Sequence, residues 1–364
     1  MKTFASVGLL ILVILLSSCG TTTTTTTSMN LLAGIRYYDG PEELTGKLVF
    51  LVQHDYTGTS NSETAASIYE FDLSQKRLRK ATDSPVGTLI GFPEGDTLCV
   101  KYWLGEVGMG KATNVVIYLK SKEAAQIVHL EGEPQNTIIL GNHVFIELKG
   151  YDHPSPGYYL TQNSRPVETK IVDYDIAAGK LKPFNFPDAD TNQSGEYGGI
   201  YRLRDLLYFH YSYQGAKTNA ASEHNLTGDY SLDVRTGNIS KCKDFDNRFA
   251  ERFLFKTFDG NDIGFDGSGW PIEGSKLIFS SGKTLHRFGR ACHLLQISPD
   301  RHFALVESIE PVSSRKFSPL GGAIITYYLV DVSNGKTRVL LKDETVVTTR
   351  SSIWGQLYWV SDWQ

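Results

Sequence analysis

Side chains that could perform acid–base catalysis are few and scattered in this chain of 364 residues. Asp152 and His153 are adjacent and could activate a serine, but one such pair is expected by chance among 9 His and 40 acidic residues. Glu147, Asp205 and Asp262 are carboxylates of the kind that glycosidases use in pairs, yet their spacing indicates nothing specific. Zinc-peptidase, phosphate-loop and Gly-x-Ser-x-Gly motifs are absent from the sequence. We therefore assign no catalytic residue.

One segment has the spacing of oxygen ligands at the start of a calcium loop. Its alternating side chains are Asp188, Asp190 and Asn192. The glycine expected at the sixth position of such a loop is Gln193, and the glutamate expected at the twelfth is Gly199. A similar fragment at 259–264 is interrupted by Ile263. We interpret both segments as polar turns and expect neither a metal ion nor a cofactor.

The N-terminus carries a modification signal. Lys2 precedes an uncharged apolar run, 8–16, that is too short to span a bilayer comfortably. The run ends in Leu16-Ser17-Ser18-Cys19, which resembles the bacterial lipobox at every position. This resemblance implies a lipoprotein signal peptide at 1–18, cleavage before Cys19, and attachment of diacylglycerol and palmitate-like chains to its thiol. The alternative is an ordinary signal peptide with a chance cysteine.

The residues after Cys19 are predicted to form a tether over 19–45. Gly20 is followed by seven consecutive threonines, 21–27, which cannot bury apolar area and should stay extended and solvated. Ten extended residues reach roughly 33 Å. We expect a protein of the bacterial cell envelope held to a membrane by its lipid. Gly20 in place of Asp slightly favours the outer membrane.

Six similar hairpins recur along the remaining chain, each with an apolar strand, a polar turn and a second strand. Aligning their turns places these residues in one column: Asp72, Lys120, Asp175, Asp233, Ile278 and Asp331. The column repeats roughly every 52 residues, and a second hairpin lies between successive copies. Four antiparallel strands per repeat of this length are typical of a β-propeller blade. A β-sandwich is the alternative, but it does not predict a repeated hairpin.

The two ends of the repeated region predict how the ring closes. The sequence ends with a hairpin of the kind that lies nearest the centre of a blade, and no outer hairpin follows it. Residues 46–54 supply another strand of this central kind. An extra strand is a further candidate at 33–38. Terminal strands that share one blade would remove an exposed sheet edge. We therefore predict an all-β propeller domain over 46–364, with six or seven four-stranded antiparallel blades closed by terminal strands.

Two segments resemble a known repeat. Ser298-Pro299-Asp300 before the strand 303–308, and the strand 68–73 with its close at 79–82, resemble the TolB-like, WD40-like propeller repeat. In that family a glycine follows the Ser-Pro-Asp box, and here Arg301 stands in its place. The stretch 28–45 is too short for the additional N-terminal domain of TolB, so the partner contacts of that domain are not carried over.

Composition limits the partners. Lys plus Arg number 36 and Asp plus Glu 40, and the resulting net charge of −4 argues against nucleic-acid binding. We expect a monomer. Cys99, Cys242 and Cys292 remain besides Cys19, which permits at most one disulfide without indicating which. Cys99 lies in an apolar strand and is predicted to be buried.

Long connections are predicted on one face of the disc. If the strands of a blade are called A to D from the centre outward, the A–B and C–D turns are short, whereas the B–C connections are long. Long loops are common binding sites. The candidate partner-binding residues on or beside them are Trp103, Tyr158, Tyr159, Tyr213, Trp270, Arg315 and Phe317. We predict a module that binds an envelope protein or glycan through this B–C face; the alternative is a propeller enzyme acting on carbohydrate or peptide in the central channel.

Overall fold

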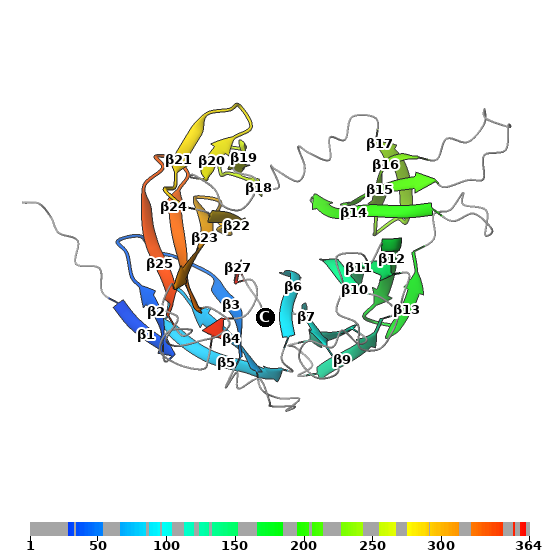
Figure 1. The fold of residues 1–364 in the computed structure, drawn as a ribbon, viewed down its shortest axis with the longest axis horizontal. Helices are drawn as coiled ribbons and strands as arrows, with labels where there is room; N and C mark the ends of the chain where they lie inside the picture. The colour runs from blue at the N-terminus through cyan, green and yellow to red at the C-terminus, as the bar shows by residue number, and fades with distance from the viewer. Residues whose placement is uncertain are drawn as a thin grey trace, which may run out of the picture.

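The structure is a computed structural model of the chain. It describes residues 28–32, 34–53, 66–84, 87–94, 97–103, 113–119, 124–130, 133–151, 166–184, 195–203, 206–213, 227–242, 255–266, 275–290, 292–312, 322–344, 352–353 and 357–361. In these ranges the regular secondary structure consists of β-strands, which pair antiparallel in six sheets around a common centre (Figure 1). We number the sheets as blades 1 to 6.

Blades 1 to 3 follow in chain order after residue 46. Blade 1 contains β3 (Lys47–Gln53), β4 (Ala66–Asp72) and β5 (Arg77–Ser84), with β26 (Ser352–Ile353) and β27 (Tyr358–Val360) paired to β3. Blade 2 contains β6 (Gly87–Glu94), β7 (Thr97–Trp103), β8 (Thr113–Leu119) and β9 (Ala124–His129). Blade 3 contains β10 (Glu133–Leu140), β11 (His143–Tyr151), β12 (Pro166–Asp175) and β13 (Lys180–Pro183).

Blades 4 to 6 complete the ring. Blade 4 contains β14 (Gly195–Leu203), β15 (Leu206–Tyr213), β16 (Gly228–Asp233) and β17 (Asn238–Cys242). Blade 5 contains β18 (Phe255–Lys256), β19 (Asp262–Asp266), β20 (Lys276–Phe279) and β21 (Thr284–Arg287). Blade 6 contains β22 (Cys292–Ile297), β23 (Phe303–Val312), β24 (Gly322–Asp331) and β25 (Thr337–Asp343), extended outward by β2 (Ile35–Tyr38) and β1 (Ser28–Leu32). The predicted all-β propeller is confirmed, with six blades and not seven.

The hydrophobic core lies between neighbouring blades, as β3 illustrates. Leu48, Phe50 and Val52 pack toward blade 6, whereas Val49 and Leu51 pack toward blade 2. Successive side chains of a strand point to opposite faces, so a strand covered on both faces needs a continuous apolar run. This requirement explains the unbroken apolar sequence in the middle of β3.

Ring closure joins the C-terminal strands β26 and β27 to β3 in blade 1. Trp359 on β27 is 2% exposed, and its Nε1 donates to the carbonyl of Thr45 at 2.8 Å. From blade 6, Gln296 Nε2 donates to the carbonyl of Trp359 at 2.8 Å. Gly46 has φ +89°, and a Cβ there would lie 2.4 Å from the carbonyl oxygen of Val360. The predicted closure by terminal strands is therefore present, and it requires a residue without a side chain at Gly46.

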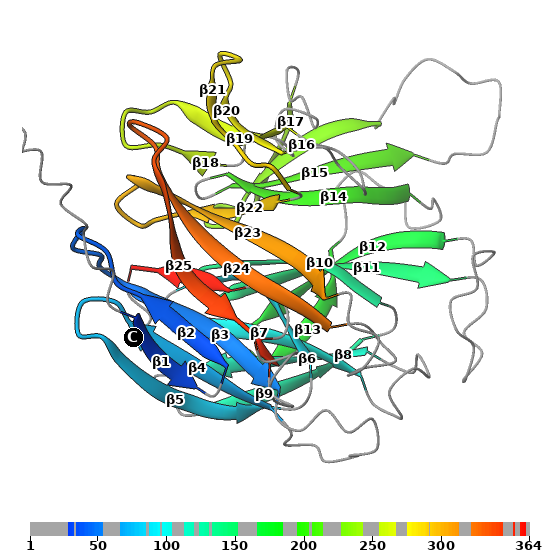
Figure 2. The same cartoon turned by 60° about the vertical axis from the view of Figure 1, so that its left-hand side comes forward.

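The sheets begin earlier than the predicted boundary at residue 46. β2 pairs with β25, and β1 pairs with β2, so blade 6 has two additional outer strands (Figure 2). Ile35 and Tyr37 are 0% and 1% exposed and pack in the cluster between blades 6 and 1. The apolar alternation of these two residues explains why the segment pairs with the sheet. The expected tether over 19–45 is thus wrong from Ser28 onward, and the extra strand suggested at 33–38 is confirmed as β2.

Candidate functional site

The aspartates of the repeating column close the C–D turns. Each accepts hydrogen bonds from backbone N–H groups two or three residues later: Asp72 from Gln75 at 2.8 Å, Asp175 from Ala178 at 2.9 Å, Asp233 from Arg235 at 3.0 Å, and Asp331 from Ser333 at 2.8 Å. The N–H of Ala178 is the main cause of a lowered pKa of the Asp175 carboxyl. These carboxylates stabilise their own turns, and this function explains why they recur.

The fourth residue after each of these aspartates has a left-handed backbone. Gly179, Gly237 and Gly335 have φ of +62°, +73° and +72°. In blade 1 the same position is Lys76, with φ +52°. A side chain in this conformation costs roughly 1–2 kcal/mol, so Lys76 calls for a separate explanation.

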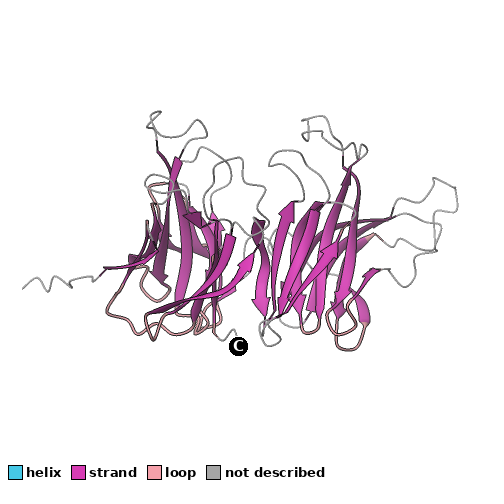
Figure 3. Cartoon of the chain, turned by 90° about the horizontal axis from the view of Figure 1, so that it is seen from below, coloured by secondary structure: helices cyan, strands magenta, loops and turns pink. Residues whose placement is uncertain are grey.

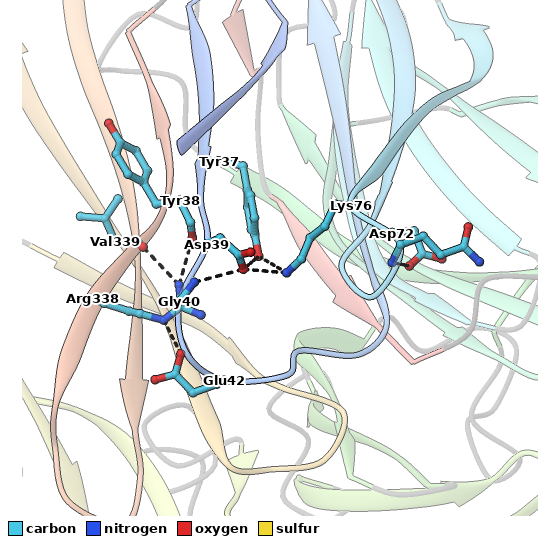
Figure 4. Close-up of polar contacts among 10 residues, drawn as sticks. Tyr37, Tyr38, Asp39, Gly40, Glu42, Asp72, Lys76, Arg338 and Val339 are labelled. Atoms are coloured by element: carbon cyan, nitrogen blue, oxygen red, sulfur yellow. Dashed lines mark hydrogen bonds and ion pairs between the residues drawn. The ribbon is translucent and has the colours of Figure 1, made fainter. Parts of the chain in front are cut away.

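Lys76 holds the N-terminal segment against blade 1 (Figure 4). Its Nζ lies 2.6 Å from Asp39 Oδ1 and donates to the hydroxyl of Tyr37 at 3.2 Å. The Tyr37 hydroxyl in turn donates to Asp39 at 3.2 Å. On the other side of the segment, Arg338 on β25 donates to Glu42 at 2.8 Å and to the carbonyl of Tyr38 at 3.1 Å. The contacts of Lys76 and Arg338 fasten residues 37–42 to blades 1 and 6.

The Ser-Pro-Asp segment forms the A–B turn of blade 6. Ser298 Oγ accepts the N–H of Phe303 at 2.9 Å and donates to Asp300 at 2.5 Å. Arg301 has φ +66°, a conformation that glycine adopts without strain. This turn explains the sequence resemblance in structural terms.

All described A–B and C–D turns lie along one edge of the disc, which we call the turn edge (Figure 3). Each B strand starts at that edge and ends at the opposite one, which we call the B–C edge. Trp103 is the last residue of β7 and pairs with Thr113, and Tyr213 is the last of β15 and pairs with Gly195. These two predicted residues therefore both reach the B–C edge, on blades 2 and 4.

Most of the other predicted residues fall outside the described ranges. They are the lipid-attachment candidate Cys19, the partner-binding candidates Tyr158, Tyr159, Trp270, Arg315 and Phe317, the pair Asp152 and His153, the carboxylate Asp205, and the calcium-like segment Asp188, Asp190 and Asn192. The structure therefore neither brings these side chains together nor separates them.

The described carboxylates that suggested catalysis make structural contacts. Glu147 Oε1 accepts the N–H of Gly199 in the next blade at 3.3 Å, and burial raises the pKa of this carboxyl. Asp262 forms an ion pair with Lys256 at 2.7 Å. Asp259 hydrogen-bonds Thr257 and Asn261 in the β18–β19 turn, as expected of a polar turn. No group of three or more potential metal ligands occurs among the described residues.

The sequence analysis missed a buried acidic group between blades 6 and 1. Asp343 is 0% exposed, and its Oδ2 accepts the N–H of Ile353 on β26 at 2.7 Å. Glu307 and Tyr327 are direct cross-strand neighbours, and burial raises the pKa of both. Glu307 inside the apolar strand β23 was a sequence signal for this group, whereas Asp343 is the last residue of β25 and gave none. The contact of Asp343 assigns this group to ring closure.

A shallow hollow of about 570 Å³ lies on the outer part of blade 6. Its lining includes Tyr38 and Tyr328 together with three cations. Each cation faces a carboxylate: Arg290 pairs with Glu310, Arg338 with Glu42 at 2.8 Å, and Lys342 with Glu344 at 2.5 Å. The hollow is therefore charge-balanced and does not indicate a particular ligand.

The three cysteines in the described ranges are free thiols. Cys99 is buried between blades 2 and 3, as predicted, and burial raises its pKa. Cys292 is also buried, whereas Cys242 is partly exposed. Within the described residues, no helix has the length and hydropathy that a membrane span requires.

No protein-family model and no curated protein sequence matches the chain. Among solved structures, it is similar to TolB from Acinetobacter baumannii, with 12% identity and a TM-score of 0.44 over 87% of this chain and 68% of TolB. It is also similar to a putative 6-phosphogluconolactonase from Bacteroides fragilis, with 12% identity and a TM-score of 0.41 over 88% of this chain and all of that chain. These likenesses concern architecture alone. The blades and the Ser298 turn agree with the TolB-like propeller repeat that the sequence resembles.

Proposed function

We propose that this protein is a lipid-anchored β-propeller of the bacterial cell envelope that binds a protein or glycan partner through its B–C edge. The observation that carries the proposal is the difference between the two edges. At the turn edge, aspartates such as Asp175 and Asp233 accept hydrogen bonds from the backbone of their own turns. A polar group already bonded within the fold has less to offer a partner.

The B–C edge has the composition of a binding surface. Trp103 and Tyr213 end strands there, and the long connections that leave this edge carry Tyr158, Tyr159 and Trp270. Tyrosine and tryptophan combine a large apolar area with a polar tip, and they dominate the energetics of many interfaces. Arg315 and Phe317 lie in the corresponding connection of blade 6 and add a cation beside a ring.

The anchor rests on Cys19. The lipobox-like sequence ends at this residue, and diacylglycerol plus further acylation would give stable membrane attachment, which a single chain does not provide. No described carboxylate group favours the alternative of catalysis in the channel, so we do not propose it.

Capture of partners from solubilised envelope extract tests the proposal. The test variant carries Ala at Tyr158, Tyr159 and Trp270. The control carries Ala at three exposed neutral residues of the turn edge, Gln75, Asn142 and Thr337. Eluates are divided and treated with protease or with glycosidase, which separates protein partners from glycans. We expect the test variant to lose at least tenfold of the captured partner while the control retains it.

Two outcomes would overturn the proposal. Loss of the partner in the control variant alone would place binding at the turn edge. Equal capture by both variants and the wild type would show that the three aromatic residues do not contribute to binding. Thermal unfolding of each variant, followed by circular dichroism, separates loss of binding from loss of fold.

A further inference from the structure

Apolar clusters fill most of the surfaces where two neighbouring blades meet, which we call seams. Within the described ranges, the clusters join blade 6 to blade 1, blade 1 to blade 2, blade 2 to blade 3, blade 3 to blade 4, and blade 5 to blade 6. The described residues form no such cluster between blades 4 and 5, which are consecutive in the ring (Figure 1). Burial of apolar area is the dominant favourable contribution when protein surfaces associate, so this seam differs in kind from the others.

The face of blade 4 that is turned toward blade 5 is polar. On β15, Leu207 and Phe209 pack against blade 3. Tyr208 and His210 alternate with them along the strand and therefore lie on the opposite face, toward blade 5. Asp229 on β16 pairs with His210 and shares this face, and its Oδ1 lies 2.8 Å from His210 Nδ1. The side chains of His210 and Asp229 are 35% and 21% exposed, so they are not enclosed by a neighbouring blade.

Asp229 occupies a position that belongs to the core in other blades. It lies four residues before the column aspartate of blade 4, and the corresponding residues are Ile68 in blade 1, Ile171 in blade 3 and Tyr327 in blade 6. These three side chains are buried, and each packs in the cluster that joins its blade to the following one. A hydrogen-bonded carboxylate thus replaces an apolar contact in the sequence of blade 4.

The face of blade 5 that is turned toward blade 4 also carries charge. The apolar residues of β19 and β20, such as Ile263 and Leu277, pack against blade 6. The residues that alternate with them face blade 4, and they are Asp262, Gly264, Asp266, Lys276 and Ile278. Asp262 forms an ion pair with Lys256 at 2.7 Å. Ile278 is buried but belongs to none of the clusters in the described ranges.

We propose that the ring opens at the seam between blades 4 and 5 while every blade stays folded. When polar walls separate, water satisfies their hydrogen-bonding groups, so the cost in free energy is small. Separation of an apolar cluster instead exposes apolar area to water. Opening at this seam therefore costs less than opening at a seam with an apolar cluster, and blade 4 remains joined to blade 3 and blade 5 to blade 6.

The opening gives the B–C edge an adjustable width between two blades. Tyr213 is the last residue of β15, so this strand of blade 4 ends at the B–C edge. Movement of blade 5 relative to blade 4 changes the space beside that strand end. The inference concerns the fold and stands whether or not the B–C edge binds a partner.

Two adjacent residues of β20 provide a matched test, because their side chains face opposite seams. Ile278 faces blade 4 and Leu277 faces blade 6, and they are 7% and 0% exposed. A cysteine at either position is shielded in the closed ring and reacts with a thiol reagent only after an opening. The variants are Ile278→Cys and Leu277→Cys, each in a Cys242→Ser background, because Cys242 is the partly exposed thiol. The buried Cys99 and Cys292 are internal references in seams with apolar clusters.

The full chain, purified in detergent, is labelled at low urea concentrations, and each site is quantified by mass spectrometry of its peptide. We expect the thiol at position 278 to react at least tenfold faster than the thiol at position 277. Its rate should change little with urea, because opening of one seam exposes little surface. Equal rates at the two positions would overturn the proposal. Faster labelling at position 278 with an equal acceleration of Cys99 would also overturn it, because Cys99 in the same molecule reports unfolding of the whole fold.

A second pair of variants tests whether the polar wall causes the opening. In the Ile278→Cys background, His210→Leu with Asp229→Ile introduces the residue types that blade 1 has at these positions. The control is His143→Leu with Asp173→Leu, which removes a histidine–aspartate pair from blade 3, at a seam with an apolar cluster. We expect the first variant to slow labelling at position 278 at least threefold and the control to leave it unchanged. Equal rates in the two variants would overturn the role of the polar wall.

Discussion

At the residue scale, two turn residues with a left-handed backbone differ in whether their side-chain contacts offset the backbone strain. Lys76 and Arg301 are the non-glycine residues with positive φ in the described chain, at +52° and +66°. Lys76 gains an ion pair with Asp39 and a hydrogen bond to Tyr37. The Arg301 side chain is exposed and forms no ion pair with a described residue.

Glycine should therefore have opposite effects at these two positions. Arg301→Gly removes the left-handed strain and should raise the free energy of unfolding by about 0.5–1 kcal/mol, after the greater chain entropy of glycine is subtracted. Lys76→Gly removes similar strain but loses the contacts to Asp39 and Tyr37, so we expect no gain or a net loss. Denaturant unfolding measures both variants. A similar gain in both would show that the Lys76 contacts contribute nothing.

The Asp39–Lys76 pair predicts a pH dependence of stability. The hydrogen bond from Lys76 is the main cause of the lowered pKa of Asp39. A carboxyl whose pKa is lower in the folded state stabilises the fold above its unfolded pKa of about 3.9, and this contribution disappears as the pH falls through the folded value. Both side chains are about one third exposed, so the contribution is small. Asp39→Asn should lower the melting temperature slightly at pH 7 and leave it unchanged near pH 2. An unchanged difference at both pH values would contradict the pairing.

At the element scale, ring closure depends on the short strand β27. Trp359 fills the cluster between blades 6 and 1, and its indole N–H bonds to Thr45. Trp359→Ala should cost about 3–5 kcal/mol of stability, because it leaves a large cavity. Trp359→Phe retains most of the packing and should cost less. Chemical denaturation of both variants checks the order, and equal losses would show that packing is not the dominant contribution.

Removal of the closing strands should be more damaging than any single substitution. A chain ending at Arg350 lacks β26 and β27, which exposes the edge of β3 and leaves Asp343 without the N–H of Ile353. A buried carboxylate without its partner is strongly destabilising. We expect this truncated chain to lack a cooperative thermal transition by circular dichroism. Normal melting would mean that blade 1 closes without the C-terminal strands.

At the scale of the whole molecule, we expect the lipid anchor and the stability of the folded domain to be independent of each other. The described core consists of packed blades from Ser28 onward, whereas the predicted anchor is at Cys19. Cys19→Ser should abolish labelling by radioactive palmitate and leave the unprocessed precursor, while the melting temperature of the detergent-extracted protein stays within about 2 °C of the wild type. Labelling of the Ser variant equal to that of the wild type would rule out Cys19 as the acceptor.

Local patterns in the sequence determined the blade hairpins. Alternating and continuous apolar runs set the strands, and the recurring Asp at positions such as 175 and 233 marked turns whose geometry is local. The burial of Cys99 followed from its apolar strand. The sequence also predicted that Trp103 and Tyr213 lie at the B–C edge. The order of strands in a blade determines at which edge each strand ends.

Tertiary structure alone decided which distant segments share a sheet. The count of six rather than seven blades depends on β26 and β27 pairing with β3, and the early start of the fold depends on β2 pairing with β25. The reason for a lysine at residue 76 became clear only when Asp39 and Tyr37 lay beside it. Periodicity reports the local conformation of a strand, whereas pairing across some 300 residues depends on which surfaces remain uncovered when the ring closes.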